Sequence, residues 1–231
     1  MKKVAIGIGI AVGCLLVVLF AKWFFGARQD EIPVAKPGPL VDFEETKVKA
    51  ERGDSGAQNT LGDLYANGRG VTQDYTLAVK WYRQAAHQGH AAAQYNLGTL
   101  YASGIGVPRN PAEAAKWYRQ SAGQGNLDAQ YNLAQMLSMG AGVPRDLAEA
   151  LKWYRQAAEQ GDALSQFNLA RRYREGKDVA VDPVEAYKWF MLAAAQGIRD
   201  AAKMRDELKH EMTRDQMAEA ERRASAFATK R

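Results

Sequence analysis

The fold is decided by two short motifs, Ala93-Gln94-Tyr95-Asn96-Leu97-Gly98 and Lys116-Trp117-Tyr118, because both recur in step along the chain. The tryptophan of the second motif returns every 36 residues, at Trp81, Trp117, Trp153 and Trp189. The first motif returns at the same spacing, at Ala57–Gly62, Ala129–Ala134 and Ser165–Ala170. A fixed period of this length is typical of a solenoid, in which small structural units stack on one another. The sequence therefore predicts a repeat protein.

Each copy predicts two antiparallel helices. The first helix, over about Ala57–Asn67 in the first copy, carries its apolar residues on one stripe. It is followed by Gly68, a residue that suits the left-handed turn at the end of a helix. The second helix begins at an N-cap residue placed three before a glutamate, as in Asn110–Glu113 and Asp182–Glu185, and it carries the tryptophan.

The small and the aromatic residues predict how these helices pack. Gly62 and Gly98 let two helices approach closely, and the tryptophans are expected to fill the space between hairpins. Because Trp117 and Trp153 lie in internal copies, each is expected to meet neighbours on both sides. In the fourth copy, Asp178 replaces the second glycine of the turn, so we expect the first helix of that copy to pack less regularly.

The ends of the array predict caps. A capping box at Asp42–Glu45 opens a helix in front of the first copy, and a second one at Thr213–Gln216 opens a last helix whose apolar residues, from Met217 to Phe227, share one face. The resulting segments are an anchor at 1–25, a linker at 26–41, a capping half repeat at 42–56, repeats at 57–92, 93–128, 129–164 and 165–200, and capping helices at 201–231.

The pattern resembles the Sel-1-like repeat family of the tetratricopeptide-repeat superfamily over about residues 42–212. The resemblance rests on the Ala-Gln-Tyr-Asn-Leu-Gly opening, on the turn at Gly104–Pro108 and on the close at Trp117–Gly125. It implies an all-α, right-handed α-solenoid of antiparallel helix hairpins, which we expect to follow a single N-terminal transmembrane helix. It also implies a protein-interaction scaffold without catalytic activity.

The N-terminus predicts a membrane anchor. An uninterrupted apolar run covers residues 4–21, and at about 1.5 Å per residue it is long enough to cross a bilayer core. Lys22, Trp23 and Phe24 occupy the place where a signal peptide would be cleaved, which favours an uncleaved span. Lys2 and Lys3 precede the span, and this bias predicts a single-pass protein of a bacterial inner membrane with its repeats in the periplasm.

Two motifs within this span leave alternatives open. Gly9 and Gly13 have the spacing that pairs membrane helices, so a dimer is one reading, although glycines are common in such spans for other reasons. Cys14 faintly resembles a lipoprotein box, but cleavage there would leave an apolar start to the mature chain; the simpler reading is an apolar residue of the span.

The sequence does not predict an enzyme, a cofactor or a metal site. His87 and His90 straddle a helix end without a third ligand at useful spacing, and a solvated helix end is the simpler reading. Some secreted members of the family are linked to β-lactam binding or hydrolysis, but those carry a cysteine pair in each repeat, and this chain has one cysteine. The net charge of +5 is modest and mixed in sign, so nucleic acid is not predicted as a partner either.

A protein or peptide partner is expected on the concave face that the first helices of such solenoids line. Candidate contacts are the stripe positions between the packing residues, whose types change from copy to copy. They are Asn59, Asp63, Asn67, Tyr95, Thr99, Ser103, Tyr131, Gln135, Met139, Phe167, Arg171 and Arg174.

Two groups of these candidates also allow other readings. Tyr95, Tyr131 and Phe167 fit a packing role as well, and Arg171, Arg172 and Arg174 would either receive an acidic peptide or pair with Glu175 and Asp178. The alternative functions are an envelope-assembly scaffold for polysaccharide or secretion machinery and, in a different class, a β-lactam-hydrolysing enzyme.

Overall fold

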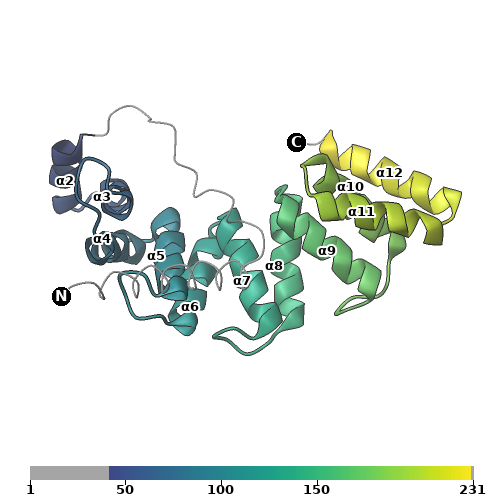
Figure 1. Ribbon diagram of the computed structural model, residues 1–231, viewed down its shortest axis with the longest axis horizontal. Coiled ribbons are helices and arrows are strands. Elements are labelled where there is room, and N and C mark those ends of the chain that lie inside the picture. The colour runs from purple at the N-terminus through teal and green to yellow at the C-terminus, as the bar shows by residue number, and fades with distance from the viewer. Residues whose placement is uncertain (1–41, 230–231) are drawn as a thin grey trace, which may run out of the picture. The chain divides into compact units, whose positions relative to one another are not determined.

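The computed structural model describes residues 42–229 of the 231, and all regular structure in that range is helical. Figure 1 shows the helices following one another in chain order. The predicted anchor, the linker, Cys14 and the Gly9/Gly13 pair lie outside the described residues. Among the described helices, none combines the length and the apolar character that crossing a membrane requires.

The helices form four hairpins of equal size between a leading helix and two closing ones. The leading helix is α2 (Phe43–Glu51), and the closing ones are α11 (Arg199–Leu208) and α12 (Arg214–Ala228), with a short 3₁₀ turn at Lys209–Glu211 between them. The hairpins are α3 (Ser55–Asn67) with α4 (Tyr75–His87), α5 (Ala91–Ser103) with α6 (Pro111–Gly123), α7 (Leu127–Met139) with α8 (Leu147–Glu159), and α9 (Ala163–Glu175) with α10 (Pro183–Ala195).

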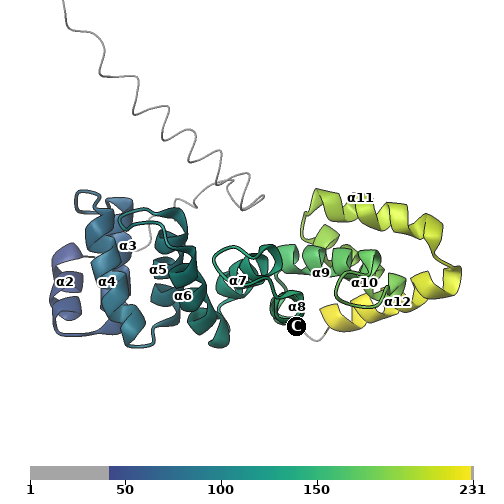
Figure 2. The same ribbon diagram turned by 90° about the horizontal axis from the view of Figure 1, so that it is seen from below.

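Neighbouring hairpins touch through the second helix of one and the first helix of the next, as α4 does with α5 and α6 with α7. Figures 1 and 2 show this succession from two directions. The predicted all-α solenoid of antiparallel hairpins is confirmed.

Helix ends explain why the elements keep the same length. The eight hairpin helices have 13 residues each, and every first helix stops at a glycine in the left-handed conformation, such as Gly104 with φ 75°. Second helices begin at Asp or Asn side chains that accept hydrogen bonds from backbone N–H groups; Asn110 accepts one from Glu113, as the sequence predicts. Pro111 and Pro183 occupy first-turn positions, where the missing N–H is not needed.

Gly62 of α3 and Gly98 of α5 each admit a tyrosine from the second helix of the same hairpin. A methyl group at Gly62 would lie 2.6 Å from the Tyr82 ring, and one at Gly98 would lie 2.9 Å from the Tyr118 ring. These contacts confirm the close approach that the small residues predict.

A buried glutamine ties each first helix to both of its neighbours. Gln94 donates a hydrogen bond to the carbonyl of Ala86 in the preceding second helix (3.1 Å) and accepts one from Gln124, which ends the following second helix (2.7 Å). The same pair of bonds is formed at Gln58, Gln130 and Gln166. We call this arrangement the glutamine bridge. It satisfies an amide that is at most 4% exposed and links three helices in every repeat.

The fourth copy keeps the helix length of the others, but its first helix carries the partly exposed Arg172 where the other copies bury Leu64, Leu100 and Met136, in line with the expectation of less regular packing. α9 has the same length and the same glycine stop, and Leu169 and Ala170 are fully buried. Asp178 takes the left-handed conformation of the glycine that it replaces, with φ 68°. Its carboxylate pairs with Arg172, and this ion pair holds the turn in place of the glycine's conformational freedom.

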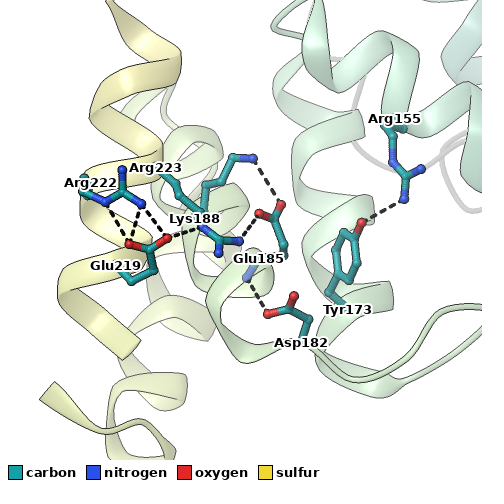
Figure 3. A network of polar contacts seen from close by, with 8 residues as sticks. All are labelled: Arg155, Tyr173, Asp182, Glu185, Lys188, Glu219, Arg222 and Arg223. Carbon is teal, nitrogen blue, oxygen red and sulfur yellow. Dashed lines mark hydrogen bonds and ion pairs between the residues drawn. The ribbon is translucent and has the colours of Figure 1, made fainter. Parts of the chain in front are cut away.

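The last helix closes the array as the sequence predicts. Thr213 and Gln216 form the predicted capping box of α12, and Phe227 of that helix meets the Trp189 ring edge-on at 5.4 Å. A polar network fastens the same helix to α10 (Figure 3). Glu185 accepts hydrogen bonds from Lys188 (3.1 Å) and from Arg223 (2.9 Å), and Arg223 also binds Glu219.

Candidate partner-binding surface

The twelve candidate residues lie on the first helices of the four hairpins, three to each of α3, α5, α7 and α9. They do not form one uniform surface. Each helix brings a different chemistry, and most of the polar groups already bond within the chain.

On α3, Asp63 is the centre of a small polar cluster that reaches α5. Its carboxylate accepts hydrogen bonds from the Tyr82 hydroxyl (2.6 Å), from Asn59 (3.2 Å) and from Asn96 of the next repeat (3.4 Å). Asn67 donates to the backbone carbonyl of Asp63. Burial raises the pKa of the Asp63 carboxyl, against the hydrogen bond from Tyr82, which lowers it. Asp63 therefore joins two repeats, and its carboxylate is not a freely exposed recognition group.

On α5, the candidates cover the buried tyrosine of α6. The Tyr95 ring packs at 5.9 Å from the Tyr118 ring, and the Thr99 hydroxyl lies 3.1 Å from the Tyr118 hydroxyl. Ser103 donates to the backbone carbonyl of Thr99. Burial raises the pKa of Tyr118, so this hydroxyl stays protonated. Of the two readings of Tyr95, the packing role is the one that the geometry supports.

Of the four first helices, α7 has the candidate residues with the fewest polar contacts to the rest of the described chain. Tyr131 is buried against the Tyr154 ring at 6.1 Å, and its hydroxyl accepts a hydrogen bond from the Gln135 amide (2.6 Å). The Gln135 side-chain oxygen is buried and has no hydrogen-bond partner among the described residues. One turn further, the Met139 side chain is 49% exposed. α7 thus presents one exposed apolar side chain, Met139, while the unpaired Gln135 oxygen lies below the surface.

On α9, each of the three arginines has an acidic partner within the chain. Arg171 pairs with Glu175, and Arg174 pairs with both Glu207 and Glu211 of the closing segment. Arg172 lies over the Tyr154 ring at 5.1 Å and pairs with Asp178. Phe167 packs against Phe190 at 6.0 Å. All three arginines thus form ion pairs within the chain. The geometry gives no support to the alternative that they bind an acidic peptide.

The histidines have structural roles. His90 Nδ1 accepts the backbone N–H of Ala93 and caps α5, and the His87 ring meets the Trp117 ring edge-on at 5.3 Å. Within residues 42–229, no group of three or more His, Cys, Asp or Glu side chains is placed to hold a metal ion.

The structure also corrects the expectation for one tryptophan. Trp117 is 5% exposed, whereas Trp153 is only partly buried and borders a cavity of about 400 Å³. The sequence holds a signal for this difference: the position that carries His87 in the first repeat carries Gly123 in the second. Without that ring, Trp153 lacks the neighbour that covers Trp117.

Comparison with known proteins shows which family and which solved structures this chain resembles. The Sel1 repeat model matches four consecutive segments of the chain, residues 55–90, 91–126, 127–162 and 163–198. Among solved structures, the chain is 34% identical to a protective antigen present in uropathogenic Escherichia coli strains, described as displaying an SLR fold, with a TM-score of 0.71 over 80% of this chain and 41% of that one. It is 32% identical to a Sel1 repeat protein from Oxalobacter formigenes, with a TM-score of 0.66 over 73% of this chain and 75% of that one.

The chain thus spans less than half the length of the first of these structures. A search of curated proteins gave no match. The four matched segments follow one another without a gap and make up more than half of the chain, so it belongs to the Sel1 repeat family.

Proposed function

We propose that this protein is a non-catalytic scaffold that binds a protein or peptide partner along the stripe of its first helices. The observation that carries the proposal is the contrast between positions. The packing residues recur from copy to copy, while the stripe changes from Asn and Asp on α3 to Gln and Met on α7 and Arg on α9. Sel1 repeat proteins generally act as interaction scaffolds, and a solenoid offers an extended surface for this.

Within the stripe, α7 is the segment that we expect to contact a partner first. Met139 offers exposed apolar area at the end of α7, one turn after the partly buried Gln135. Methionine adapts to irregular apolar surfaces, so it suits a binding position.

The test is quantitative capture of partners from membranes with the full chain. A Gln135→Ala/Met139→Ala double variant is expected to retain at least about tenfold less partner, corresponding to ~1.4 kcal/mol of binding free energy. Lys152→Ala, an exposed change on the second helix α8, is the matched control and should retain wild-type amounts. Equal capture by the double variant and the wild type, at equal melting temperature, would count against the stripe. An envelope-assembly scaffold would further require the captured proteins to belong to polysaccharide or secretion machinery.

The absence of catalysis is part of the proposal and has its own test. The family alternative, β-lactam hydrolysis, is examined by following nitrocefin turnover with the purified full chain. We expect the rate to equal that of buffer. Saturable hydrolysis that copurifies with the protein would replace the scaffold with an enzyme.

We also propose that residues 4–21 hold the chain in a bacterial inner membrane as a single span, with the repeats in the periplasm. The apolar run and the two lysines before it support this arrangement. The protein should stay with membranes through carbonate washing, and alkaline phosphatase fused after Arg231 should be active. A soluble form that begins near Ala27 would overturn the anchor.

A further inference from the structure

The cavity beside Trp153 arises from a single difference between repeats. In the other internal repeat, the His87 ring from the preceding hairpin stands against Trp117; at the end of the array, the Phe227 ring stands against Trp189. At the position equivalent to His87, the next hairpin has Gly123, which contributes no side chain. One side of the Trp153 ring therefore borders a hollow of about 400 Å³, which we call the Trp153 hollow.

The Trp153 hollow lies between the C-terminal ends of two second helices. α6 ends at Gly123 and α8 ends at Glu159, and both residues line the hollow together with Gln156. Gln130 and Gln160 line it as well, joined by the hydrogen bond of the glutamine bridge (3.0 Å). Of this pair, Gln130 is buried, whereas Gln160 is exposed, as is Glu159.

Three features of the Trp153 hollow favour a positive charge. The last carbonyl groups of two helices carry partial negative charge, and the face of an indole ring is negative as well. Glu159 adds a full carboxylate, and no ion pair to it is formed within residues 42–229. The nearby cation Arg119 is already neutralised by Glu149, with nitrogen–oxygen distances of 3.0–3.2 Å. The Trp153 N–H donates to that same Glu149, so the ring is held in place.

The chain itself shows which cations lie over its aromatic rings. At the equivalent tryptophans the cation is the neighbouring lysine, as at Lys116 over Trp117 (5.9 Å) and Lys188 over Trp189 (4.1 Å), and at Tyr154 it is an arginine paired with a carboxylate. Arg172 lies over the Tyr154 ring at 5.1 Å and pairs with the carboxylate of Asp178. A guanidinium group is planar and weakly hydrated, so it stacks on an aromatic face while its N–H groups bind a carboxylate. The Trp153 hollow is lined by both an aromatic side chain, Trp153, and a carboxylate, Glu159.

We propose that the Trp153 hollow binds an arginine side chain of a partner protein, stacked on Trp153 and paired with Glu159. This inference rests on the proposed scaffold function and adds to it a second contact point, on the second helices and apart from the first-helix stripe. It names the chemistry of the partner at that point: a protruding arginine.

The test is a titration of the full chain in detergent, followed by fluorine NMR of fluorine-labelled tryptophan, with the Trp153 signal assigned through Trp153→Phe. The probe is N-acetyl-arginine amide, and its control is N-acetyl-citrulline amide, which has nearly the same shape without the charge. The arginine probe should move the Trp153 signal saturably. Because tenfold corresponds to ~1.4 kcal/mol, the loss of one charge contact should weaken binding by about that factor, both for the citrulline probe and for Glu159→Gln.

Two variants make the titration specific. Gly123→His should place in the hollow the ring that His87 places against Trp117 and should abolish the response. A side chain is tolerated there, because an added Cβ meets no heavy atom within 4 Å. Glu51→Gln removes an exposed carboxylate at the position equivalent to Gly123, beside Trp81, and should leave the Trp153 response unchanged.

The outcomes separate this inference from the scaffold proposal. An equal response to citrulline, an unchanged response in Gly123→His, or a larger response to neutral N-acetyl-tyrosine amide would overturn the arginine site. The titration needs no partner protein, so its failure leaves the first-helix stripe untouched. If the wild-type protein captures no partner from membranes in the experiment described under Proposed function, the scaffold proposal itself fails.

Discussion

The different burial of Trp117 and Trp153 goes with one residue of the preceding hairpin. Trp117 has the His87 ring against it and is 5% exposed; Trp153 has Gly123 at the same place and borders a hollow. Large apolar side chains stabilise a fold in proportion to the area that they remove from water. Two tryptophans at the same repeat position are therefore expected to contribute differently.

Replacing these tryptophans should reveal that difference. Trp117→Ala is expected to lower the free energy of unfolding by about 3–5 kcal/mol, because it removes a buried ring and leaves a cavity. Trp153→Ala should cost about half as much, since part of its ring contacts no protein atoms. Urea denaturation followed by circular dichroism measures both. An equal or larger effect at Trp153 would contradict the burial that the structure assigns to it.

The turn glycines allow a sharper comparison, because two of them share a backbone conformation and differ only in surroundings. Gly142 has φ 79° and would place a methyl group against the backbone of Pro111, whereas Gly125 has φ 89° and open space around it. Gly125→Ala should cost about 1–2 kcal/mol from left-handed strain alone. Gly142→Ala adds overpacking worth about 1–3 kcal/mol more, which thermal melts of the two variants would resolve. Equal melting temperatures of the two variants would show that the turn around Gly142 shifts to make room for the added methyl group.

At the scale of the helices, the glutamine bridge is the polar contact that links each first helix to the second helices on both sides of it. Gln166 is 1% exposed and bonds to Ala158 of α8 and to Gln196 at the end of α10. Gln166→Leu keeps the volume but leaves these partners with one bond fewer, so the free energy of unfolding should fall by about 1–3 kcal/mol. The control Gln196→Ala removes the exposed member of the pair and should cost about 1 kcal/mol or less. A stabilised Gln166→Leu variant would mean that the bridge selects the register of the helices without adding stability.

The junction of α10 with α12 makes the stability depend on pH. Burial would raise the pKa of Glu185, but the hydrogen bond from Arg223 and the charge of Lys188 outweigh it and hold the pKa below the usual 4.5. A carboxyl whose pKa is lower in the folded state stabilises the fold above its unfolded pKa and loses that contribution as pH falls through the folded value.

Glu185→Gln should therefore be less stable than the wild type at pH 7 by about 1 kcal/mol, and the gap should close as the pH falls below 4.5 and through the lowered pKa of Glu185. Urea titrations of both proteins across this range give the gap directly. Glu221→Gln, an exposed change on the same α12, should show no such trend. A gap that widens in acid would reverse the sign derived from the ion pairs.

For the whole molecule, periodic features were predictable from sequence and aperiodic ones were not. The first helix of the first copy ends at Asn67 and the second helices begin directly after Asn110 and Asp182, as predicted, because glycine and the N-cap side chains act locally. The cluster around Asp63 and the pairing of Arg174 with Glu207 depend on which groups meet across repeats, and no local pattern encodes that. Gly123 was visible as a departure from His87, but its consequence for Trp153 required the stacking of hairpins in space.

The end of the array is expected to matter more for its neighbour than for distant repeats. α12 buries Ala220 and Ala224 against the last hairpin and sets Phe227 on Trp189. Stability in a solenoid is a sum over repeats and nearest-neighbour interfaces, so removal of residues 213–231 takes away one interface and uncovers one tryptophan. The truncated chain should melt at a lower temperature, with the α9–α10 hairpin losing amide-exchange protection while α3 to α6 keep theirs. If protection falls evenly across all four repeats, the array unfolds as one cooperative unit and the nearest-neighbour description does not apply to this protein.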